Sequence, residues 1–281
     1  MSNFQSIFIV GPTASGKSDL SIELAELLGA EIICADSQTI RRKMDIGTAK
    51  PTESGRARVP HHMLDIIDPY EPYSLALFLE QTRPVLDDIK ARGKKTIIVG
   101  GTGLYSDALY FNFELPELSL AELGVLETAE LQSLVRDMGY SLPENKENPR
   151  HLVNTIKRGG RTGKKGRPMQ DSLIIGINPG REVLIERINA RVDIMFELGF
   201  VDEVRAIIDM YGEPSREFDA IGYRIAHRLT KGEINELEAR ELFKSADRQY
   251  AKRQLSWYKR NPDIVWFSSP DEAKTFIIEQ A

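Results

Sequence analysis

Cysteine and long apolar runs are both scarce in this chain of 281 residues. Its single cysteine, Cys34, has no partner for a disulfide within the chain, as is usual in a reducing cytoplasm. No segment approaches the roughly 18 consecutive apolar residues of a membrane span. The apolar run at residues 7–10 is too short for the core of a signal peptide. The sequence therefore predicts a cytoplasmic protein that does not enter the membrane.

An excess of positive charge is also missing. The 37 Lys and Arg residues are outnumbered by 42 Asp and Glu, and the net charge of −5 argues against a general nucleic-acid binder. Basic residues nevertheless cluster at residues 41–43, 157–167 and 248–260. A local basic surface on an acidic protein can bind a phosphate backbone, although solvated surface also explains any one such cluster.

Short β-forming apolar runs alternate with helical periodicity along most of the chain. Strands are expected at residues 6–10, 31–35, 94–101, 172–177 and 263–267, with later helices at 201–211 and 235–259. Asn178 and Pro179 are expected to cap and begin another helix. This order predicts an α/β fold, a P-loop-containing doubly wound and mostly parallel sheet, with ligands at the carboxyl ends of the strands.

The pattern changes between residues 115 and 148, where an acidic, helix-forming segment is bounded by prolines. We expect a small helical insertion at 115–148, between a first part of the core at 1–114 and a second part at 149–281. The chain shows no internal repeats.

Residues 11–18 match the phosphate-binding pattern GxxxxGK[ST] and lie between a predicted strand and a predicted helix. The backbone amides of such a loop bind phosphate oxygens, Lys17 adds a positive charge, and the Ser18 hydroxyl is a ligand for Mg²⁺. The predicted phosphate-binding residues are Gly11, Pro12, Thr13, Ala14, Ser15, Gly16, Lys17 and Ser18.

Nucleotide hydrolases of this class usually carry a second strand that ends in a metal-binding aspartate. The best candidate strand here ends in Gly100, Gly101 and Thr102 instead. The nearest carboxylate at a strand end is Asp36, which we expect to face the bound phosphates and to be suited to proton abstraction. The missing aspartate argues more strongly against an ATP hydrolase than against a kinase.

Further blocks resemble the tRNA dimethylallyltransferase family, also called isopentenyl-tRNA transferases. They are GPTASGKS at 11–18, ADSQTIRRKMDIGTAKP at 35–51, PHHMLDIIDPYEPYSLALF at 60–78, VGGTGLY at 99–105, RVDIMFELGFVDEV at 191–204, IGYR at 221–224 and DRQYAKRQLSWY at 247–258. The blocks span nearly the whole chain in the expected order, which chance agreement does not explain.

The resemblance implies transfer of a dimethylallyl group from dimethylallyl diphosphate to the exocyclic amine of the adenosine 3′-adjacent to the anticodon of tRNA, with release of diphosphate. It implies Mg²⁺ as cofactor, tRNA and dimethylallyl diphosphate as partners, and no obligate protein partner; a monomer is the expected state. Two other functions stay open, namely prenyl transfer to free AMP or ADP and a P-loop small-molecule kinase. A non-catalytic RNA-binding relative is opposed by the presence of Lys17, Ser18, Asp36 and Arg224.

By the same resemblance, three residues have catalytic roles. Asp36 takes the proton of the amine, Thr102 positions the reacting groups, and Arg224 stabilises the leaving diphosphate. Each also has a purely structural alternative, in which Asp36 caps the following turn, Thr102 binds a loop amide and Arg224 pairs with Asp219. His61 and His62 are expected to be structural rather than metal ligands.

The residues expected to contact tRNA form three groups. They are Asp36, Ser37, Gln38, Thr39 and Thr102 at the site, Arg150, His151 and Asn154 on one helix, and Arg248, Lys252 and Arg253 on another. Arg41 stands where the family usually has tyrosine, and His151 and Asn154 stand where it usually has arginines. These departures concern RNA recognition, and the basic loop at 157–167 is a candidate replacement for the missing arginines.

Overall fold

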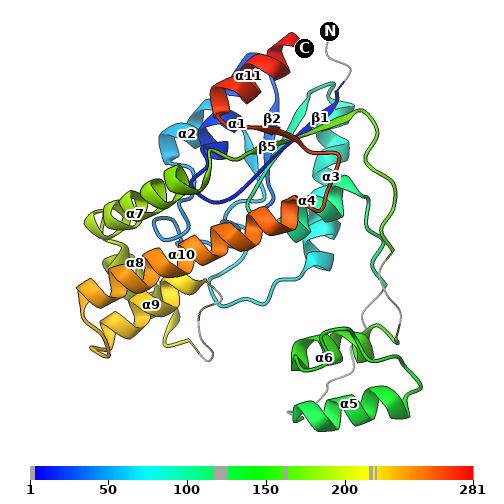
Figure 1. The fold of residues 1–281 in the computed structure, drawn as a ribbon, viewed down its shortest axis with the longest axis vertical. Coiled ribbons are helices and arrows are strands. Elements are labelled where there is room, and N and C mark those ends of the chain that lie inside the picture. Colours follow the sequence, from blue (N-terminus) through cyan, green and yellow to red (C-terminus); the bar gives the residue numbers. More distant parts are fainter. Residues whose placement is uncertain (1–3, 117–125, 161–163, 215–217, 219, 281) are drawn as a thin grey trace. The chain divides into compact units, whose positions relative to one another are not determined.

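The computed structural model describes residues 4–116, 126–160, 164–214, 218 and 220–280. The chain divides into two compact units, one made of Met1–Tyr110 and Met169–Ala281 and the other of Phe111–Pro168 (Figure 1). Among the described residues, no helix combines the length and the apolar character that crossing a membrane requires.

The larger unit is built on a parallel sheet, as predicted. Its described strands are β1 (Ser6–Val10), β2 (Glu31–Cys34), β3 (His61–His62), β4 (Thr96–Val99), β5 (Ser172–Ile177) and β6 (Val265–Phe267). They lie in the order β3-β2-β4-β1-β5-β6, and every neighbouring pair is parallel. The chain thus builds one side of β1 before it crosses to the other side for β5, which creates a switch point where ligands of such sheets bind.

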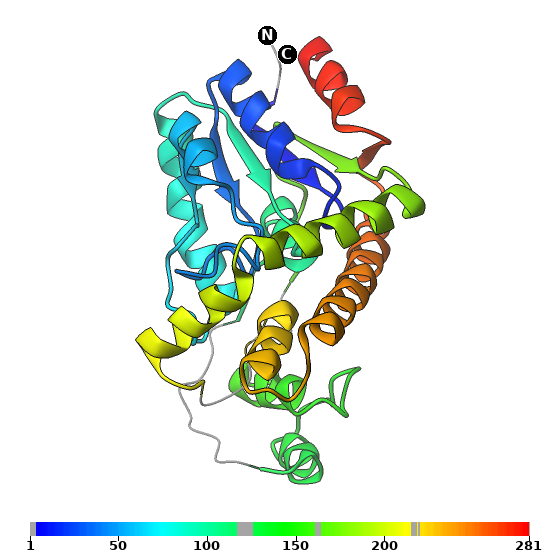
Figure 2. The same ribbon diagram turned by 90° about the vertical axis from the view of Figure 1, so that its left-hand side faces the viewer.

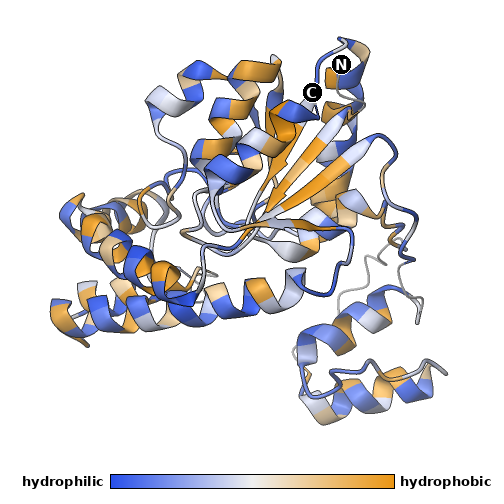
Figure 3. Ribbon diagram, turned by 45° about the horizontal axis from the view of Figure 1, so that its top comes forward, coloured by the Kyte–Doolittle hydropathy of each residue, from blue (hydrophilic) through white to orange (hydrophobic). Residues whose placement is uncertain are grey.

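Helices cover both faces of the sheet. Those outside the small unit are α1 (Lys17–Leu28), α2 (Glu53–Arg58), α3 (Leu75–Ala91), α4 (Gly103–Tyr110), α7 (Arg181–Glu197), α8 (Phe200–Tyr211), α9 (Ile221–Thr230), α10 (Glu236–Tyr258) and α11 (Pro270–Glu279). Alternate strand residues such as Ile7 and Ile9 pack with Leu24 of α1 and Ile277 of α11. On the other face, the Phe8 ring contacts Tyr110 of α4 at 5.3 Å between ring centres. The strands consist largely of apolar residues (Figure 3), as burial between two helical layers requires.

Helices α7 to α10 pack together as a separate apolar cluster that extends beyond the carboxyl ends of the strands (Figure 2). The aromatic rings of Phe200, Tyr223 and Phe243 lie at its centre. The ring centre of Phe200 is 5.0 Å from that of Tyr223 and 5.6 Å from that of Phe243. This cluster provides the wall opposite the sheet, so that a ligand at the switch point lies between strand ends and helices.

Glu203 of α8 holds the loop that follows β2. Its carboxylate accepts hydrogen bonds from the backbone amides of Asp45, Ile46 and Gly47 at 3.0, 2.7 and 3.2 Å. Gly47 packs so closely against the helices that a Cβ there would lie 2.1 Å from the Phe200 ring. The loop is therefore fixed to α8 by polar and steric contacts together.

The smaller unit contains α5 (Thr128–Asp137) and α6 (Pro149–Lys157). Leu131 and Val135 of α5 pack against Leu152 and Ile156 of α6 in a cluster of their own. The predicted boundaries at 115 and 148 are therefore wrong, because α6 buries its apolar side against the insertion and belongs with it. The part of the predicted insertion at 117–125 lies outside the described residues.

The predicted start of α7 is also wrong. Gly180, not Asn178, is the N-cap, and Arg181 is the first helical residue. The Asn178 side chain instead accepts a hydrogen bond from the Gly180 amide at 3.4 Å, which makes a turn before the helix. An Asn side chain can satisfy either arrangement, so the sequence alone does not choose between them.

Replacing Glu203 by alanine should destabilise the protein, because three loop amides and the Tyr223 hydroxyl lose their acceptor. We expect the free energy of unfolding to fall by about 1–3 kcal/mol. Chemical denaturation measures this, with Asp209→Ala on the exposed side of the same helix as the control. Equal effects of the two variants would contradict the assignment of Glu203 as the anchor of the loop.

Candidate functional site

The phosphate loop joins β1 to α1 in a conformation that only small residues permit. Gly11 has φ +140°, and a Cβ there would lie 2.5 Å from the carbonyl oxygen of Ile177 on β5. Gly16, with φ +91°, is the N-cap of α1, so the helix begins at Lys17 with its first amides beside the loop. Helix N-termini attract anions because their amide dipoles point outward.

Lys17 is buried beneath the loop. Its Nζ donates to the carbonyl of Pro12 at 2.5 Å and to the Ser15 hydroxyl at 3.3 Å. Burial, reinforced by the nearby Arg191 guanidinium, lowers the pKa of Lys17 to about 7, whereas Asp36 acts in the opposite direction. The Arg191 guanidinium and the buried Lys17 ammonium repel each other, and an anion bound beside both would offset that repulsion.

A cavity of about 610 Å³ opens at this loop. Six of the eight predicted loop residues, Thr13 to Ser18, line it together with Asp36, Ser37, Gln38, Thr39 and Arg224. Gly11 and Pro12 are buried and do not line it. The cavity therefore brings together residues from the strand ends of β1 and β2 and from α9, which are far apart in the sequence.

Asp36 follows β2 and faces the cavity. Its Oδ1 accepts a hydrogen bond from the Gln38 amide at 2.8 Å, and its Oδ2 accepts one from the Gly101 amide at 3.3 Å. The structural alternative is thus present as well, since Asp36 does cap the following turn. Turn formation and a position in the cavity coexist, and the two amides fix the direction of the carboxylate.

Thr102 lies on the turn after β4, in the place where nucleotide hydrolases carry an aspartate. Its Oγ1 accepts a hydrogen bond from the Ser37 amide at 3.0 Å and donates one to the Ser37 hydroxyl at 3.3 Å. The buried Tyr250 hydroxyl of α10 also interacts with Thr102, and burial raises the pKa of that tyrosine. Thr102 therefore satisfies a loop amide while it connects the turn to the segment that carries Asp36.

Arg191 of α7 is a site residue for which the sequence predicted no role. Its guanidinium donates to Thr13 Oγ1 in the phosphate loop at 2.6 Å and to Asp247 of α10 at 2.6 Å. Burial raises the pKa of Asp247, and the Arg191 charge partly offsets this. The signal was present in the block that begins at residue 191, but nothing in the spacing showed that its first residue reaches the loop 178 positions earlier.

The helices α7, α9 and α10 add apolar residues to the cavity lining, beside charged ones. The apolar residues are Met195 of α7, Ala220, Ile221 and Gly222 at the start of α9, and Phe243 of α10. The same cavity thus combines an anion-binding end with a surface that suits a short hydrocarbon chain.

Arg224 and Arg253 both line the cavity, whereas Arg248 and Lys252 do not. Arg248 instead donates to Asn189 of α7 at 2.7 Å, and Lys252 is exposed on α10. Asp219, the alternative partner of Arg224, lies outside the described residues. Trp257 packs on Gly103 and donates to Asp107 at 2.8 Å, which places its indole against α4.

Arg41 is structural. It is 4% exposed, and its guanidinium donates to the backbone carbonyls of Pro69 and Glu71 at 2.7 and 2.9 Å. The interpretation of residues 41–43 as one basic surface is therefore wrong for Arg41. Its guanidinium is buried and holds the backbone of residues 69–71. Gln38 and Thr39, by contrast, line the cavity and have buried side-chain oxygens without a partner.

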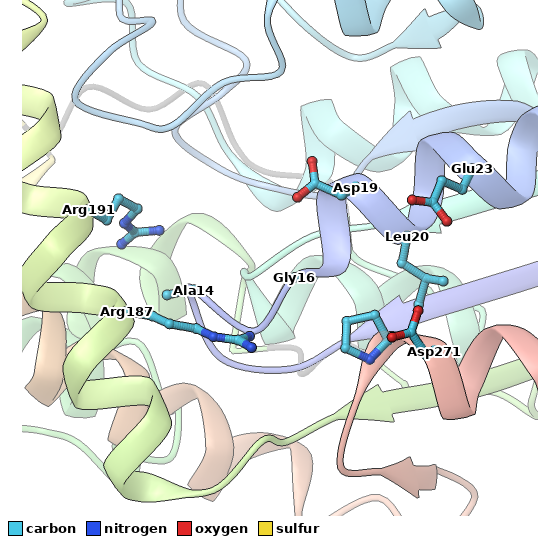
Figure 4. Close-up of a pocket in the computed structure, with 9 residues that line it drawn as sticks. Ala14, Gly16, Asp19, Leu20, Glu23, Arg187, Arg191 and Asp271 are labelled. Carbon is cyan, nitrogen blue, oxygen red and sulfur yellow. The ribbon is translucent and has the colours of Figure 1, made fainter.

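A second hollow of about 470 Å³ lies on the other side of the phosphate loop. Figure 4 shows Arg187 and Arg191 extending from α7 toward the loop at Ala14 and Gly16, with acidic side chains of α1 and α11 nearby. Arg191 lines both hollows, so its guanidinium forms part of the partition between them.

In the smaller unit, the predicted RNA-contacting residues share α6. Arg150 and His151 are exposed, and Asn154 is half-buried. Asn148 caps this helix by accepting the Arg150 amide at 3.0 Å, and Pro149 is its first residue. Of the basic loop at 157–167, residues 161–163 lie outside the described part.

The described residues contain no group of three or more His, Cys, Asp or Glu side chains arranged to hold a metal. His61 and His62 are bound to the Val59 carbonyl and the Glu31 carboxylate, at 2.9 and 2.8 Å. Mg²⁺ does not require three protein ligands, since it commonly binds one or two protein oxygens together with phosphate oxygens and water. Ser18 and Asp36, which line one cavity, fit that requirement when a diphosphate is bound.

A sequence model described as IPP transferase matches residues 39–261. The chain belongs to the IPP transferase family. A protein of Staphylococcus saprophyticus named tRNA dimethylallyltransferase is 34% identical over 98% of this chain and 94% of its own.

Two solved structures support this membership. The full-length tRNA isopentenylpyrophosphate transferase of Bacillus halodurans has a TM-score of 0.75 and 33% identity, covering 98% of this chain and 96% of that one. The tRNA delta(2)-isopentenylpyrophosphate transferase of Staphylococcus epidermidis has a TM-score of 0.74 and 35% identity, covering 98% of both chains. The predicted fold class and family are confirmed.

The lowered pKa of Lys17 makes diphosphate binding depend on pH. Above pH 7 the lysine of the free protein is mostly neutral. A bound anion raises its pKa, so binding takes up a proton, and affinity should fall by up to about tenfold per pH unit above pH 7. Calorimetry in two buffers of different ionisation enthalpy measures the proton uptake.

The Lys17→Arg variant is the control, because its guanidinium stays protonated and the protons exchanged by the diphosphate itself remain. Proton uptake that is equal in the two proteins would show that Lys17 is already charged in the free site.

Proposed function

We propose that this chain transfers a dimethylallyl group from dimethylallyl diphosphate to the exocyclic amine of the adenosine 3′-adjacent to the anticodon in tRNA, releasing diphosphate. The observation that carries the proposal is the composition of one cavity. It combines a phosphate loop, three arginines, several apolar residues and the Asp36 carboxylate in one lining. Membership of a family whose curated relatives are named tRNA dimethylallyltransferase supports the same reaction.

The reaction needs a base and a stabilised leaving group. The adenine amine is a weak nucleophile because its lone pair is delocalised into the ring. As its nitrogen bonds to C1 of the dimethylallyl group, the bond from C1 to the diphosphate oxygen breaks and the amine proton passes to Asp36. The two backbone amides on Asp36 keep its carboxylate aimed while this occurs.

The diphosphate gains negative charge as it leaves. Lys17, Arg191 and Arg224 are the cationic residues that line the cavity near the loop and oppose that charge. A Mg²⁺ ion held by Ser18 and the diphosphate, with Asp36 nearby, would supply further charge neutralisation.

The target base must leave its stack to reach the cavity, which costs a few kcal/mol. Gln38 and Thr39 offer unpartnered side-chain oxygens at the cavity, where an adenine edge can donate to them. Arg253 lies at the same cavity and is exposed, as a phosphate contact requires. We assign Arg150, His151 and Asn154 to contacts elsewhere on the tRNA.

Two other functions, prenyl transfer to a free nucleotide and a small-molecule kinase, fit the site less well. Free AMP or ADP needs neither the exposed basic residues of α10 nor those of α6. A small-molecule kinase needs ATP and a metal ion, which an aspartate at the end of a neighbouring strand usually holds. Here β4, which pairs with β1, is followed by Gly100, Gly101 and Thr102 instead.

Mass spectrometry of nucleosides tests the proposal. The protein is incubated with dimethylallyl diphosphate, Mg²⁺ and unmodified tRNA whose anticodon loop contains three consecutive adenosines, with AMP in a parallel reaction. We expect one C5H8 unit to be added to adenosine of the tRNA. Asp36→Asn should lower kcat by about 10²–10⁴-fold, because an amide of the same size cannot take the proton.

The outcomes separate the alternatives. Modified AMP with untouched tRNA would move the function to the free nucleotide. An Asp36→Asn variant as active as the wild type would remove Asp36 as the base while leaving the transfer reaction in place.

A further inference from the structure

Gln254 of α10 connects two backbone segments of the site. Its side-chain Oε1 accepts a hydrogen bond from the Thr13 amide at 2.8 Å, and its Nε2 donates one to the Gly101 carbonyl at 2.7 Å. Only 5% of the residue is exposed. Both ends of one buried amide are thus bound to backbone groups, one in the phosphate loop and one in the turn after β4.

Each of the two backbone segments that Gln254 binds also contacts a side chain with a role in the proposed reaction. The Gly101 amide donates to Asp36 Oδ2 at 3.3 Å, so the residue held by Gln254 also directs the base. Thr13 Oγ1 accepts the hydrogen bond of Arg191 at 2.6 Å, so the other end directs a cation of the diphosphate site. Gln254 therefore fixes the loop that binds the leaving group relative to the carboxylate that takes the proton.

The fit is tight on the Gly101 side. A Cβ at Gly101 would lie 2.4 Å from Gln254 Nε2 and 3.2 Å from Asp36 Oδ2. A side chain there would therefore displace the Gln254 amide from its present position. The Thr13 amide is also taken by Gln254, so this amide of the loop does not point at phosphate.

We propose that Gln254 is a positioning residue for prenyl transfer, which sets the distance between the bound diphosphate and Asp36. The inference rests on the proposed function. Gln254 lines the cavity, but its amide oxygen and nitrogen are bound to backbone groups, so it acts through Thr13 and Gly101 rather than on the substrate. A displacement of about 1 Å between reacting groups can lower a rate by 10²-fold.

Gln254→Met removes both hydrogen bonds while keeping the length of the side chain. We expect kcat to fall by about 10–100-fold, with little change in the KM for tRNA. Gln249→Met, at an exposed position of the same helix, is the matched control for the cost of placing methionine in α10. A thermal melt of each variant shows that the protein is folded.

Gln254→Glu provides a readout that a merely structural role does not move. A protonated glutamic acid can accept from Thr13 and donate to Gly101, whereas the ionised form loses the donor. Burial raises the pKa of such an acid. The kcat of this variant relative to wild type should therefore rise as the pH is lowered from about 8.5 to about 6.

Calorimetry with magnesium diphosphate tests the loop end of the bridge without turnover. Gln254→Met should bind it more weakly, by about 5-fold or more, because the phosphate loop loses an anchoring hydrogen bond.

Three results overturn the inference: a kcat of Gln254→Met equal to that of wild type, a Gln254→Glu ratio that is flat with pH, or unchanged diphosphate binding. If the wild type forms no prenylated nucleoside, the proposed function fails, and the binding experiment still decides whether Gln254 anchors the loop.

Discussion

Two positive groups, Lys17 and Arg191, are held against the same short loop, and the rest of the site is arranged around them. Lys17 is buried with its pKa lowered to about 7, and Arg191 contributes to that lowering. Asp247 pairs with Arg191 at 2.6 Å, whereas Lys17 donates to a carbonyl and a hydroxyl. A ligand with two or more negative charges relieves this repulsion, which is why the site suits a diphosphate.

The parts that surround this pair supply the remaining chemistry from independent elements. The strand ends place Asp36 and Gly101 in the cavity lining, and the helical cluster contributes Met195, Ile221 and Phe243. Thr102 does not line the cavity but binds Ser37, which does. Glu203 ties the loop at 45–47 to α8, so the wall and the strand ends keep a fixed separation. In the reaction that we propose, charge selects the diphosphate and the apolar residues select the group that the diphosphate carries.

The sequence predicted the positions of the main strands along the chain, the phosphate loop and the position of Asp36, because each follows from a local pattern. It did not predict β3, whose two residues are too few to show a pattern, or the cap of α7, where Asn178 had two local uses. Arg191 and Gln254 had no local signal for their roles, since they act on loops 178 and 241 positions away. Arg41 looked like surface charge until its partners, the carbonyls of the 69–71 loop, were known.

We infer that the phosphate loop binds the leaving group of a prenyl donor and not a nucleotide. The decisive measurement is competition between ATP and a non-reactive dimethylallyl thiolodiphosphate, followed with Mg²⁺ and tRNA present. We expect the analogue to bind in an excess of ATP, with no ATP consumed. Displacement of the analogue by ATP, with transfer or hydrolysis of the terminal phosphate of ATP, would instead show that the loop binds a nucleotide.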